Sequence, residues 1–264
     1  QQAIKLNPRF LILIIPSRWY SGGKGLDEFR RQMLTDRRIR RLVDYESFKD
    51  VFPGVDLAGG VCYFLWDRTY NGPCEVTNEN KDHPSTMKRF LDEYEILVRQ
   101  NHALTIIRRV QNANVPFASL EKRVLARKPF GLPTNYEPQK CGVPCWFIQK
   151  IGLSYAAKED VFDTKGILNK WKFLVPKAPI AGQTDFSKPV GFYYDGNTRI
   201  SSPGECCTES WIVAGAFDSE DEVKSYKSYL FTKTVRFLLL QTVVSQDVTK
   251  RNFRFIPDLV KYEI

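Results

Sequence analysis

The sequence predicts an incomplete α/β sheet followed by an α+β region. Strand-like apolar runs at residues 10–15, 38–45 and 60–68 surround a segment with helical spacing at 26–36. Three strands and one helix are too few to close an α/β sheet, so residues 1–78 are expected to be the C-terminal portion of a larger domain. Residues 79–264 mix further strand-like and helical segments and are expected to form a second domain.

The first run, "FLILII" from Phe10 to Ile15, is continuous and apolar, as in a strand buried on both faces. In the helical segment, Leu26, Phe29 and Met33 recur along one side. A loop rich in Gly and Pro separates the second and third runs, and the turn signal Asn71-Gly72-Pro73 ends the third. Each boundary of the expected sheet therefore has a local signal.

A polar stretch, "VTNENKDHPST" at 76–86, is predicted to be a linker, and a long helix is predicted from Thr86 to about Asn112. Asp218 to Glu222 supply an N-cap and an acidic first turn for a helix that runs through Tyr229. The remaining expectations are a short helix leading into a Gly/Pro loop within 117–136, strands at 145–152, 171–178 and 209–217, and helices at 161–171 and 232–244.

Composition favours a polyanionic partner. The 264 residues are 43% hydrophobic and 13% aromatic, which supports a real core, and the formal net charge is +9. A basic balance favours nucleic acid first and an acidic membrane surface second, the alternative being a merely basic soluble protein. No apolar run approaches the ~20 residues that span a bilayer, so no membrane role is expected.

The six cysteines are expected to be reduced thiols of a cytoplasmic protein, since no export signal is recognised. Cys141, Cys145, Cys206 and Cys207 could in principle form a four-thiolate zinc site. Adjacent cysteines rarely serve one tetrahedral ion together, so packing thiols are favoured and no metal is expected.

Motifs for catalysis are missing. His83 and His102 are the two histidines, and neither has a nucleophile partner in the sequence. The loop in "IIPSRWYSGGKG", residues 14–25, has neither the Gly-x4-Gly-Lys spacing of a phosphate-binding loop nor the Gly-x-Gly-x-x-Gly of a dinucleotide site. We therefore expect no catalytic residue and no cofactor-binding residue within this chain.

Basic and aromatic residues instead gather in loops and at element ends. Lys and Arg neutralise phosphates, Asn, Ser and Thr read base edges, and aromatic rings stack on bases, whereas a single such cluster can equally be a solvated face. Five clusters in a +9 chain favour nucleic acid. The candidate contacts are Arg18, Lys24, Lys128, Phe130, Thr134, Asn135, Arg199, Ser201, Lys233, Arg236 and Arg251.

Several long strings resemble a known family. "FLILIIPSRWYSGGKGLDEFRRQMLTDRRIRRLVDYESFKDVFPGVDLAGGVCYFLWDR" resembles the second half of the catalytic domain of bacterial DNA adenine-N6 methyltransferases, in particular of type II restriction–modification enzymes. "RKPFGLPTNY", "WKFLVPKA", "SPGECCTESWIVAGAF" and "SYLFTKTVRFLLLQTVVSQDVTKRNFRFIPDL" resemble their target-recognition domain. The resemblance implies a remnant of a Rossmann-like methyltransferase sheet at 1–78 and a DNA-specificity domain at 79–264.

The departures from the family pattern concern catalysis. The family binds S-adenosylmethionine at a Gly-rich loop and holds a flipped adenine with Asn/Asp-Pro-Pro-Tyr/Phe. This chain has no such loop, and its nearest string, "NPRF" at 7–10, lacks the second Pro. The cofactor is therefore expected in a full-length parent, and this chain alone is expected to be inactive.

The resemblance implies that the chain grips double-stranded DNA in a bacterial cytoplasm and reads a short sequence for a methyltransferase half in the same or a separate chain. Lys128, Phe130, Thr134 and Asn135 would form a recognition loop. The other candidates would support that loop or bind phosphate. One alternative is a protein-interaction subunit that completes a split methyltransferase or nuclease and has little DNA affinity. A functional enzyme, the third possibility, would have to bind S-adenosylmethionine.

Overall fold

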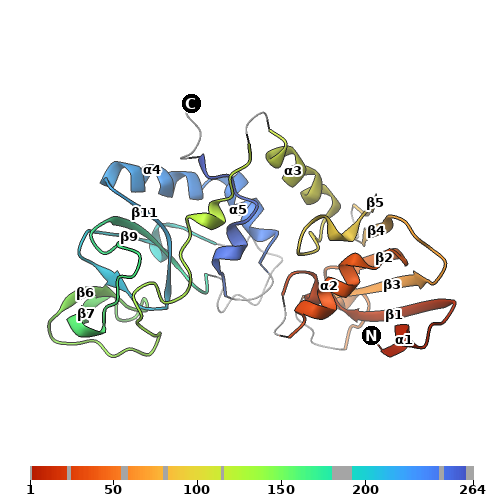
Figure 1. Cartoon of the computed structure of the whole chain (residues 1–264), viewed down its shortest axis with the longest axis horizontal. Helices are drawn as coiled ribbons and strands as arrows, with labels where there is room; N and C mark the ends of the chain where they lie inside the picture. The colour runs from red at the N-terminus through yellow and green to blue at the C-terminus, as the bar shows by residue number, and fades with distance from the viewer. Residues whose placement is uncertain are drawn as a thin grey trace. The chain divides into compact units, whose positions relative to one another are not determined.

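A computed structural model describes residues 2–22, 25–54, 59–79, 83–113, 116–179, 192–243 and 247–259. The chain folds as two compact units, Gln1–Val110 with Gln241–Ser245, and Gln111–Leu240 with Gln246–Ile264 (Figure 1). The main division thus falls at residue 110 and not at residue 78, where the sequence suggested it. No helix in the described ranges is both long and apolar enough to cross a membrane.

The first unit is built on a five-stranded mixed sheet of order β1-β3-β2-β4-β5. β2 and β4 run parallel, and the other neighbours run antiparallel. Its elements are α1 (Gln2–Lys5), β1 (Phe10–Pro16), η1 (Ser17–Tyr20), α2 (Asp27–Thr35), β2 (Ile39–Tyr45), η2 (Phe48–Asp50), β3 (Val61–Asp67), β4 (Cys74–Glu79), β5 (Ser85–Arg89), η3 (Leu91–Glu93) and α3 (Asn101–Gln111).

One face of this sheet carries the core of the unit. Met33 and Leu34 of α2 pack with Leu42, Phe64 and Trp66 from β2 and β3, and all five side chains are buried. The expected helix and three strands are therefore confirmed, and the apolar stripe of α2 explains why the helix lies on the sheet.

β1 does not have the expected burial. Its described neighbour is β3 alone, and Phe10, Ile12 and Ile14 are 54%, 65% and 52% exposed. The expectation of a strand buried on both faces was wrong for this chain. An apolar run shows that a strand can be buried, but it does not show that other elements cover both of its faces. β1 is an apolar edge strand.

The segment after β3 also differs from the prediction. The stretch expected to be a linker contains the end of β4 and the start of β5, which pair from Cys74↔Arg89 to Asn78↔Ser85. The predicted long helix is limited to α3, because residues before Asn101 run through β5, η3 and non-helical backbone. Extended backbone near Leu97 is fixed by a hydrogen bond from its N–H to the carbonyl of Tyr20, 2.8 Å long.

The second unit contains two three-stranded sheets, of order β10-β6-β7 and β11-β8-β9. β10 and β6 run parallel, and the other pairs run antiparallel. Its elements are η4 (Leu120–Lys122), β6 (Val143–Trp146), β7 (Leu153–Ala156), η5 (Lys158–Asp160), β8 (Trp171–Pro176), η6 (Asp195–Asn197), β9 (Arg199–Ser201), β10 (Cys206–Cys207), β11 (Trp211–Phe217), α4 (Glu220–Leu230), α5 (Lys233–Leu240) and η7 (Lys250–Phe253).

Both sheets contribute to one core, in which Cys145, Phe147, Leu174 and Val213 are fully or almost fully buried. α4 begins as predicted, because Ser219 accepts from the N–H of Glu222 and the Glu222 carboxylate accepts from the N–H of Ser219. The segment 161–171, predicted to be a helix, is a series of turns. There the Asp163 carboxylate accepts from the N–H groups of Ile167 and Leu168 and replaces helical hydrogen bonds.

Cys145, Cys206 and Cys207 are buried and unbridged, and Cys141 is exposed. In the described part of the chain, no three His, Cys, Asp or Glu side chains gather in a way that could hold a metal ion.

Candidate functional site

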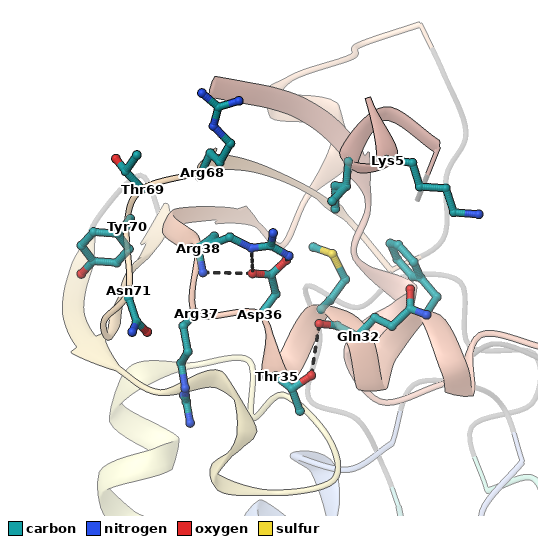
Figure 2. A pocket seen from close by; sticks show the side chains of 13 residues that line it. Lys5, Gln32, Thr35, Asp36, Arg37, Arg38, Arg68, Thr69, Tyr70 and Asn71 are labelled. Carbon is teal, nitrogen blue, oxygen red and sulfur yellow. Dashed lines mark hydrogen bonds and ion pairs between the residues drawn. The ribbon is translucent and has the colours of Figure 1, made fainter. Parts of the chain in front are cut away.

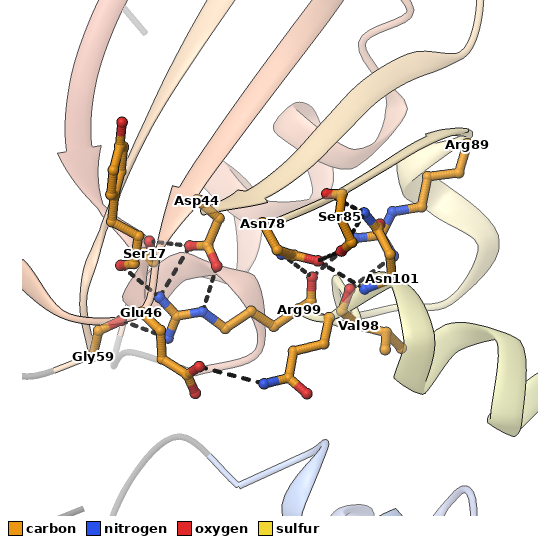
Figure 3. A network of polar contacts seen from close by, with 12 residues as sticks. Ser17, Asp44, Glu46, Gly59, Asn78, Ser85, Arg89, Val98, Arg99 and Asn101 are labelled. Carbon is orange, nitrogen blue, oxygen red and sulfur yellow. Dashed lines mark hydrogen bonds and ion pairs between the residues drawn. The ribbon is translucent and has the colours of Figure 1, made fainter. Parts of the chain in front are cut away.

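Polar side chains gather where β1, β2 and β4 end. The strand register places Pro16, Tyr45 and Glu79, the last residues of β1, β2 and β4, at the same end of the sheet. Val61, the first residue of β3, pairs there with both Pro16 and Tyr45. Carboxyl ends of strands are where α/β sheets place their ligand sites. A network of polar contacts lies at this end of the sheet in the first unit (Figure 3).

A buried ion pair lies at the centre of this end of the sheet. The Arg99 guanidinium donates to both carboxylate oxygens of Asp44 at 2.6 and 3.0 Å, and the Asp44 side chain is 3% exposed. Ser17 donates to the same carboxylate at 3.0 Å. Arg99 also donates to the carbonyls of Tyr45 and Gly59 at 3.0 Å each. Arg99 thus ties the end of β2 to the loop that leads into β3, and Asp44 adds Ser17, the residue after β1.

A second set of amides joins the β4–β5 hairpin to α3. Asn101 donates to the carbonyls of Val76 and Ser85 at 3.0 and 3.1 Å, and its N–H donates to the Asn78 side chain at 2.8 Å. Arg89 is buried and donates to the carbonyls of Val98 and Arg99 at 2.8 and 3.1 Å. Burial lowers the pKa of Arg89 to about 10. These donors satisfy backbone carbonyls, so their role is structural.

The cavity at this end of the sheet is too small for a nucleoside cofactor. Asp44, Asn78, His83 and His102 are among its lining residues, and its volume is about 40 Å³. Pockets for drug-sized ligands and cofactors are roughly 300–1,000 Å³. This small cavity therefore does not fit S-adenosylmethionine.

The loop after β1 presents Arg18 to solvent. Trp19 and Tyr20, which follow Arg18 in η1, are 1% and 3% exposed and belong to the core. Arg30 of α2 donates to the carbonyls of Trp19 and Gly22 at 2.7 and 2.6 Å and so fixes the loop. Arg18 is exposed on this fixed turn. Lys24, the other candidate in this loop, lies outside the described residues.

In the second unit, a loop from Lys128 to Tyr136 presents two polar side chains between anchored ends. Phe130 and Leu132 are 0% and 1% exposed, and the Tyr136 hydroxyl donates to Asp160 at 2.7 Å and accepts from the N–H of Ala157 at 3.0 Å. Thr134 and Asn135 lie between these anchors and are exposed. Phe130 does not suit the base-contacting role that the sequence suggested, because its ring fills the core.

A buried carboxylate fixes the start of the same loop. Glu209 accepts from Arg127 at 2.5 Å and lies 3.7 Å from Lys128 and 3.6 Å from Lys177. Burial raises the pKa of Glu209, but the hydrogen bond and charge of Arg127, with Lys177 and Lys128, outweigh burial and lower that pKa below its usual value. Lys128 is exposed and adopts a positive φ of 54°, an uncommon conformation for a residue other than glycine.

The two supporting candidates from β9 differ in position. Arg199 is half-buried, donates to the carbonyls of Gly196 and Thr198 at 3.1 and 2.6 Å, and lies over the rings of Trp146 and Trp211. Ser201 is 0% exposed and pairs with Lys172 in the sheet. The expectation that Ser201 contacts a ligand does not agree with this burial, and Arg199 is largely committed to its own loop.

The C-terminal cations are more accessible. Lys233 and Arg251 are exposed, in the first turn of α5 and in η7 respectively. A cation in the first turn of a helix interacts unfavourably with the helix dipole. A contribution to helix stability therefore does not explain the position of Lys233. Arg236 is half-buried over the Phe231 ring, with its guanidinium carbon 5.5 Å from the ring centroid.

Sequence reasoning missed the residues that fix these loops. Arg99 and Glu209 lie far along the chain from their charged partners, and Arg30 binds backbone carbonyls 8 and 11 residues away, so no short motif marks these residues. Lys172 was also missed, although a lysine inside the apolar run "WKFLVP" is an unusual signal.

Comparisons with known proteins agree with the resemblance in the sequence. Residues 1–52 match the family model described as Eco57I restriction-modification methylase. An uncharacterized adenine-specific methylase of Mycoplasma pneumoniae is 32% identical over 72 residues, which are 27% of this chain and 17% of the relative. These matches confirm that the chain resembles restriction–modification adenine methylases.

Among solved structures, the type IIG restriction endonuclease BpuSI aligns with a TM-score of 0.34 and 9% identity, over 96% of this chain and 40% of that one. The chain thus spans a small part of the curated relative and less than half of the solved chain.

Proposed function

We propose that this chain is the DNA-recognition part of a restriction–modification adenine methylase. The observation that carries the proposal is the loop of the second unit, in which Thr134 and Asn135 are exposed between the buried Leu132 and the hydrogen-bonded Tyr136. A fixed loop with exposed hydroxyl and amide groups suits direct readout of base edges, because Asn and Thr form directional hydrogen bonds there. Lys128 would accompany them from the same loop.

The exposed cations would supply affinity without sequence preference. Arg18, Lys233 and Arg251 are exposed and can neutralise phosphates, and Arg199 and Arg236 would contribute less because they are half-buried. Lys24 stays in the proposal from its sequence position alone. Phe130 and Ser201 are withdrawn, since neither side chain reaches the surface.

A panel of duplexes tests this division of labour by fluorescence anisotropy. Asn135→Ala should reduce the difference in affinity between preferred and other duplexes by about 1–3 kcal/mol per lost base contact. Arg251→Ala should weaken binding to every duplex and lower the salt slope by about 1. Lys158→Ala, at an exposed cation outside the proposed contacts, is the matched control. Equal effects of Asn135→Ala and Arg251→Ala on every duplex would refute the division.

We further propose that methyl transfer depends on a cofactor-bearing part that completes the first unit. S-adenosylmethionine would bind to that part, in the same or a separate chain. Support comes from the 40 Å³ cavity at the strand ends and from the unpaired edge of β1. Calorimetry with this chain and S-adenosylmethionine should show no binding, and saturable binding would instead favour a functional enzyme.

A second candidate function, a protein-interaction subunit, is favoured by β1 itself. The backbone edge of β1 is a template for pairing with another strand, and Phe10, Ile12 and Ile14 expose an apolar face beside it. The occupant would be the rest of the catalytic sheet. Ile12→Lys should abolish capture of a separately expressed cofactor-bearing methyltransferase part, while Lys88→Ala on β5 should leave capture intact. Strong capture combined with no DNA binding would favour this function over the first.

A further inference from the structure

The first unit contains a second, much larger cavity, at the opposite end of the sheet from the Asp44–Arg99 pair. Its volume is about 740 Å³, and α1, α2, the turn before β2 and the turn after β3 enclose it (Figure 2). β2 is seven residues long, so the two ends of the sheet lie roughly 20 Å apart at ~3.3 Å per residue. The cavity is therefore separate from the strand ends discussed above.

The lining of this cavity is strongly basic. Lys5, Arg37, Arg38 and Arg68 are four cations, and Asp36 is the one carboxylate among the lining residues. Hydroxyl and amide groups of Thr35, Thr69, Tyr70, Asn71 and Gln32 complete the polar part of the wall. The side chains of Gln32, Thr35, Thr69 and Tyr70 already donate to protein acceptors, so the cations are the main donors that this wall offers to an anionic ligand.

Two of the four cations are already neutralised. Arg37 forms a two-pronged pair with Asp92 at 2.9 and 2.8 Å, and Arg38 pairs with Asp36 at 2.7 Å. Lys5 and Arg68 are exposed and have no carboxylate partner among the described residues. Arg68 donates one bond, to the carbonyl of Asn7 at 3.0 Å, and keeps other donors available.

Further positive charge surrounds the cavity. Arg9 and Arg40 lie 3.7 and 3.6 Å from the same carboxylate, Asp67, and more than half of each arginine side chain is exposed. The guanidinium of Arg40 lies 5.7 Å from the ring centroid of Tyr70, a lining residue. One carboxylate cannot neutralise two guanidinium groups, so this rim adds to the excess positive charge.

The cations do not converge on one point. Figure 2 shows Arg68, Arg37 and Lys5 on different sides of the cavity, with Arg38 and Asp36 between them. A single phosphate would contact one of these groups at a time, whereas a ligand with several phosphates would reach more than one. A cavity of 740 Å³ has room for a ligand of nucleotide size.

We infer that this cavity binds a nucleotide with more than one phosphate, through Lys5 and Arg68 as the primary anion contacts. The shared chemistry is the phosphate group. Its source is either a free nucleoside polyphosphate or a short stretch of single-stranded nucleic acid. The inference does not depend on the recognition loop, which lies in the other unit.

Calorimetry with the full chain and two probes, ADP and a single-stranded trinucleotide, tests this site. Wild type should bind at least one probe, and Lys5→Glu and Arg68→Ala should each raise Kd at least about tenfold. Lys5 has no hydrogen bond or ion pair within the described ranges, so its substitution should not disturb folding. Arg109→Ala, an exposed cation on α3, is the matched control and should leave Kd unchanged.

Tighter binding of ADP would identify a free nucleotide as the source, and tighter binding of the trinucleotide would identify single-stranded nucleic acid. Absence of saturable binding for both probes would overturn the inference. So would an equal loss in Arg109→Ala, because the effect would then reflect net charge alone. Asn135→Ala should bind both probes like wild type, which separates this site from the proposed recognition loop.

Discussion

At the scale of single residues, the most consequential side chain in the first unit is Arg99. It bridges Asp44, Tyr45 and Gly59, and the Asp44 carboxylate is buried against its guanidinium. Two charges buried together contribute little net stability relative to an apolar pair. Removal of one partner, however, leaves the other charge buried without compensation. The pair therefore fixes the geometry of the strand ends.

Arg99→Ala should lower the free energy of unfolding by about 3–5 kcal/mol, because Asp44 is left buried and uncompensated. Urea unfolding followed by circular dichroism measures this loss. Adding Asp44→Asn to Arg99→Ala should recover part of it. Arg31→Ala, which breaks the exposed pair with Glu28, is the control and should cost at most about 1 kcal/mol. A loss for Arg99→Ala no larger than the control would contradict the structural role.

Lys172 is the most unusual residue of the second unit. Its side chain is 0% exposed, and its ammonium donates to the carbonyls of Leu168, Lys170 and Ser202 at 3.0, 2.6 and 3.0 Å. Burial lowers its pKa to about 8 from a usual value of 10.5. Three backbone carbonyls thus accept hydrogen bonds from the buried ammonium group. Through them, Lys172 joins the turn before β8 to the loop after β9.

The shifted pKa of Lys172 predicts a pH dependence with a definite sign. Between pH 8 and 10.5 the unfolded chain keeps a proton that the folded chain has released, so this residue makes the folded state more stable as pH rises. Buried thiols such as Cys74, whose pKa is raised to about 12, act in the opposite direction. The contribution of Lys172 must therefore be measured as a difference between variants.

Urea midpoints at pH 7.5 and 9.5 isolate that difference. Lys172→Met should remove the stabilising contribution on going to pH 9.5, so the variant gains less, or loses more, than wild type. Lys165→Met, at an exposed lysine, should follow wild type. A parallel pH response of wild type and Lys172→Met would show that Lys172 titrates as it does in the unfolded chain.

At the scale of elements, the entry to β3 depends on Gly60. Its φ is 76°, and a Cβ there would collide with the carbonyl of Tyr45 and the guanidinium of Arg99. The preceding Gly59 also has a positive φ, 93°, but a Cβ there would meet nothing within 4 Å. A substitution at Gly59 would therefore cause backbone strain alone, whereas a substitution at Gly60 would cause both strain and a steric collision.

Gly60→Ala should destabilise the first unit by at least about 2 kcal/mol, because it adds a collision to the strain of a left-handed residue. Gly59→Ala should cost about 1 kcal/mol from strain alone. Thermal unfolding of the two variants compares them directly. If both variants lost the same stability, the close packing of Arg99 against this turn would be refuted.

Elements whose signals are local could be predicted from the sequence. α2 and α4 were recognised from an apolar stripe and from the Ser219 cap. β5 and the start of α3 could not, because helical spacing among Leu91, Leu97 and Val98 is also satisfied by a non-helical segment whose side chains enter one core. The Asn78 side chain that binds the N–H of Asn101 comes from a distant strand and leaves no local mark.

Within the loop proposed to read DNA, the sequence indicated residues of suitable chemistry but not which of their side chains reach the surface. Lys128, Thr134 and Asn135 are at the surface as a contact role requires, whereas Phe130 fills the core. An aromatic residue beside a basic one can stack on a base or anchor its loop, and only packing distinguishes the two. The same holds for Ser201, whose burial follows from its pairing in β9.

At the scale of the whole molecule, the two units divide the proposed work. The first unit has an apolar edge strand and a cavity of about 40 Å³ at its strand ends, which suits a sheet completed by another part. The second unit contains the fixed loop proposed to read DNA. The basic composition agrees with a polyanionic partner but, without the loop, would not specify which unit reads sequence.

The central claim, recognition of DNA sequence by this chain, is tested most directly by selection from a randomised duplex library followed by sequencing of the bound fraction. The account predicts enrichment of one short motif by wild type and loss of that enrichment in Asn135→Ala, with residual salt-dependent binding. Binding without enrichment of any motif, or no binding to duplex DNA, would contradict it.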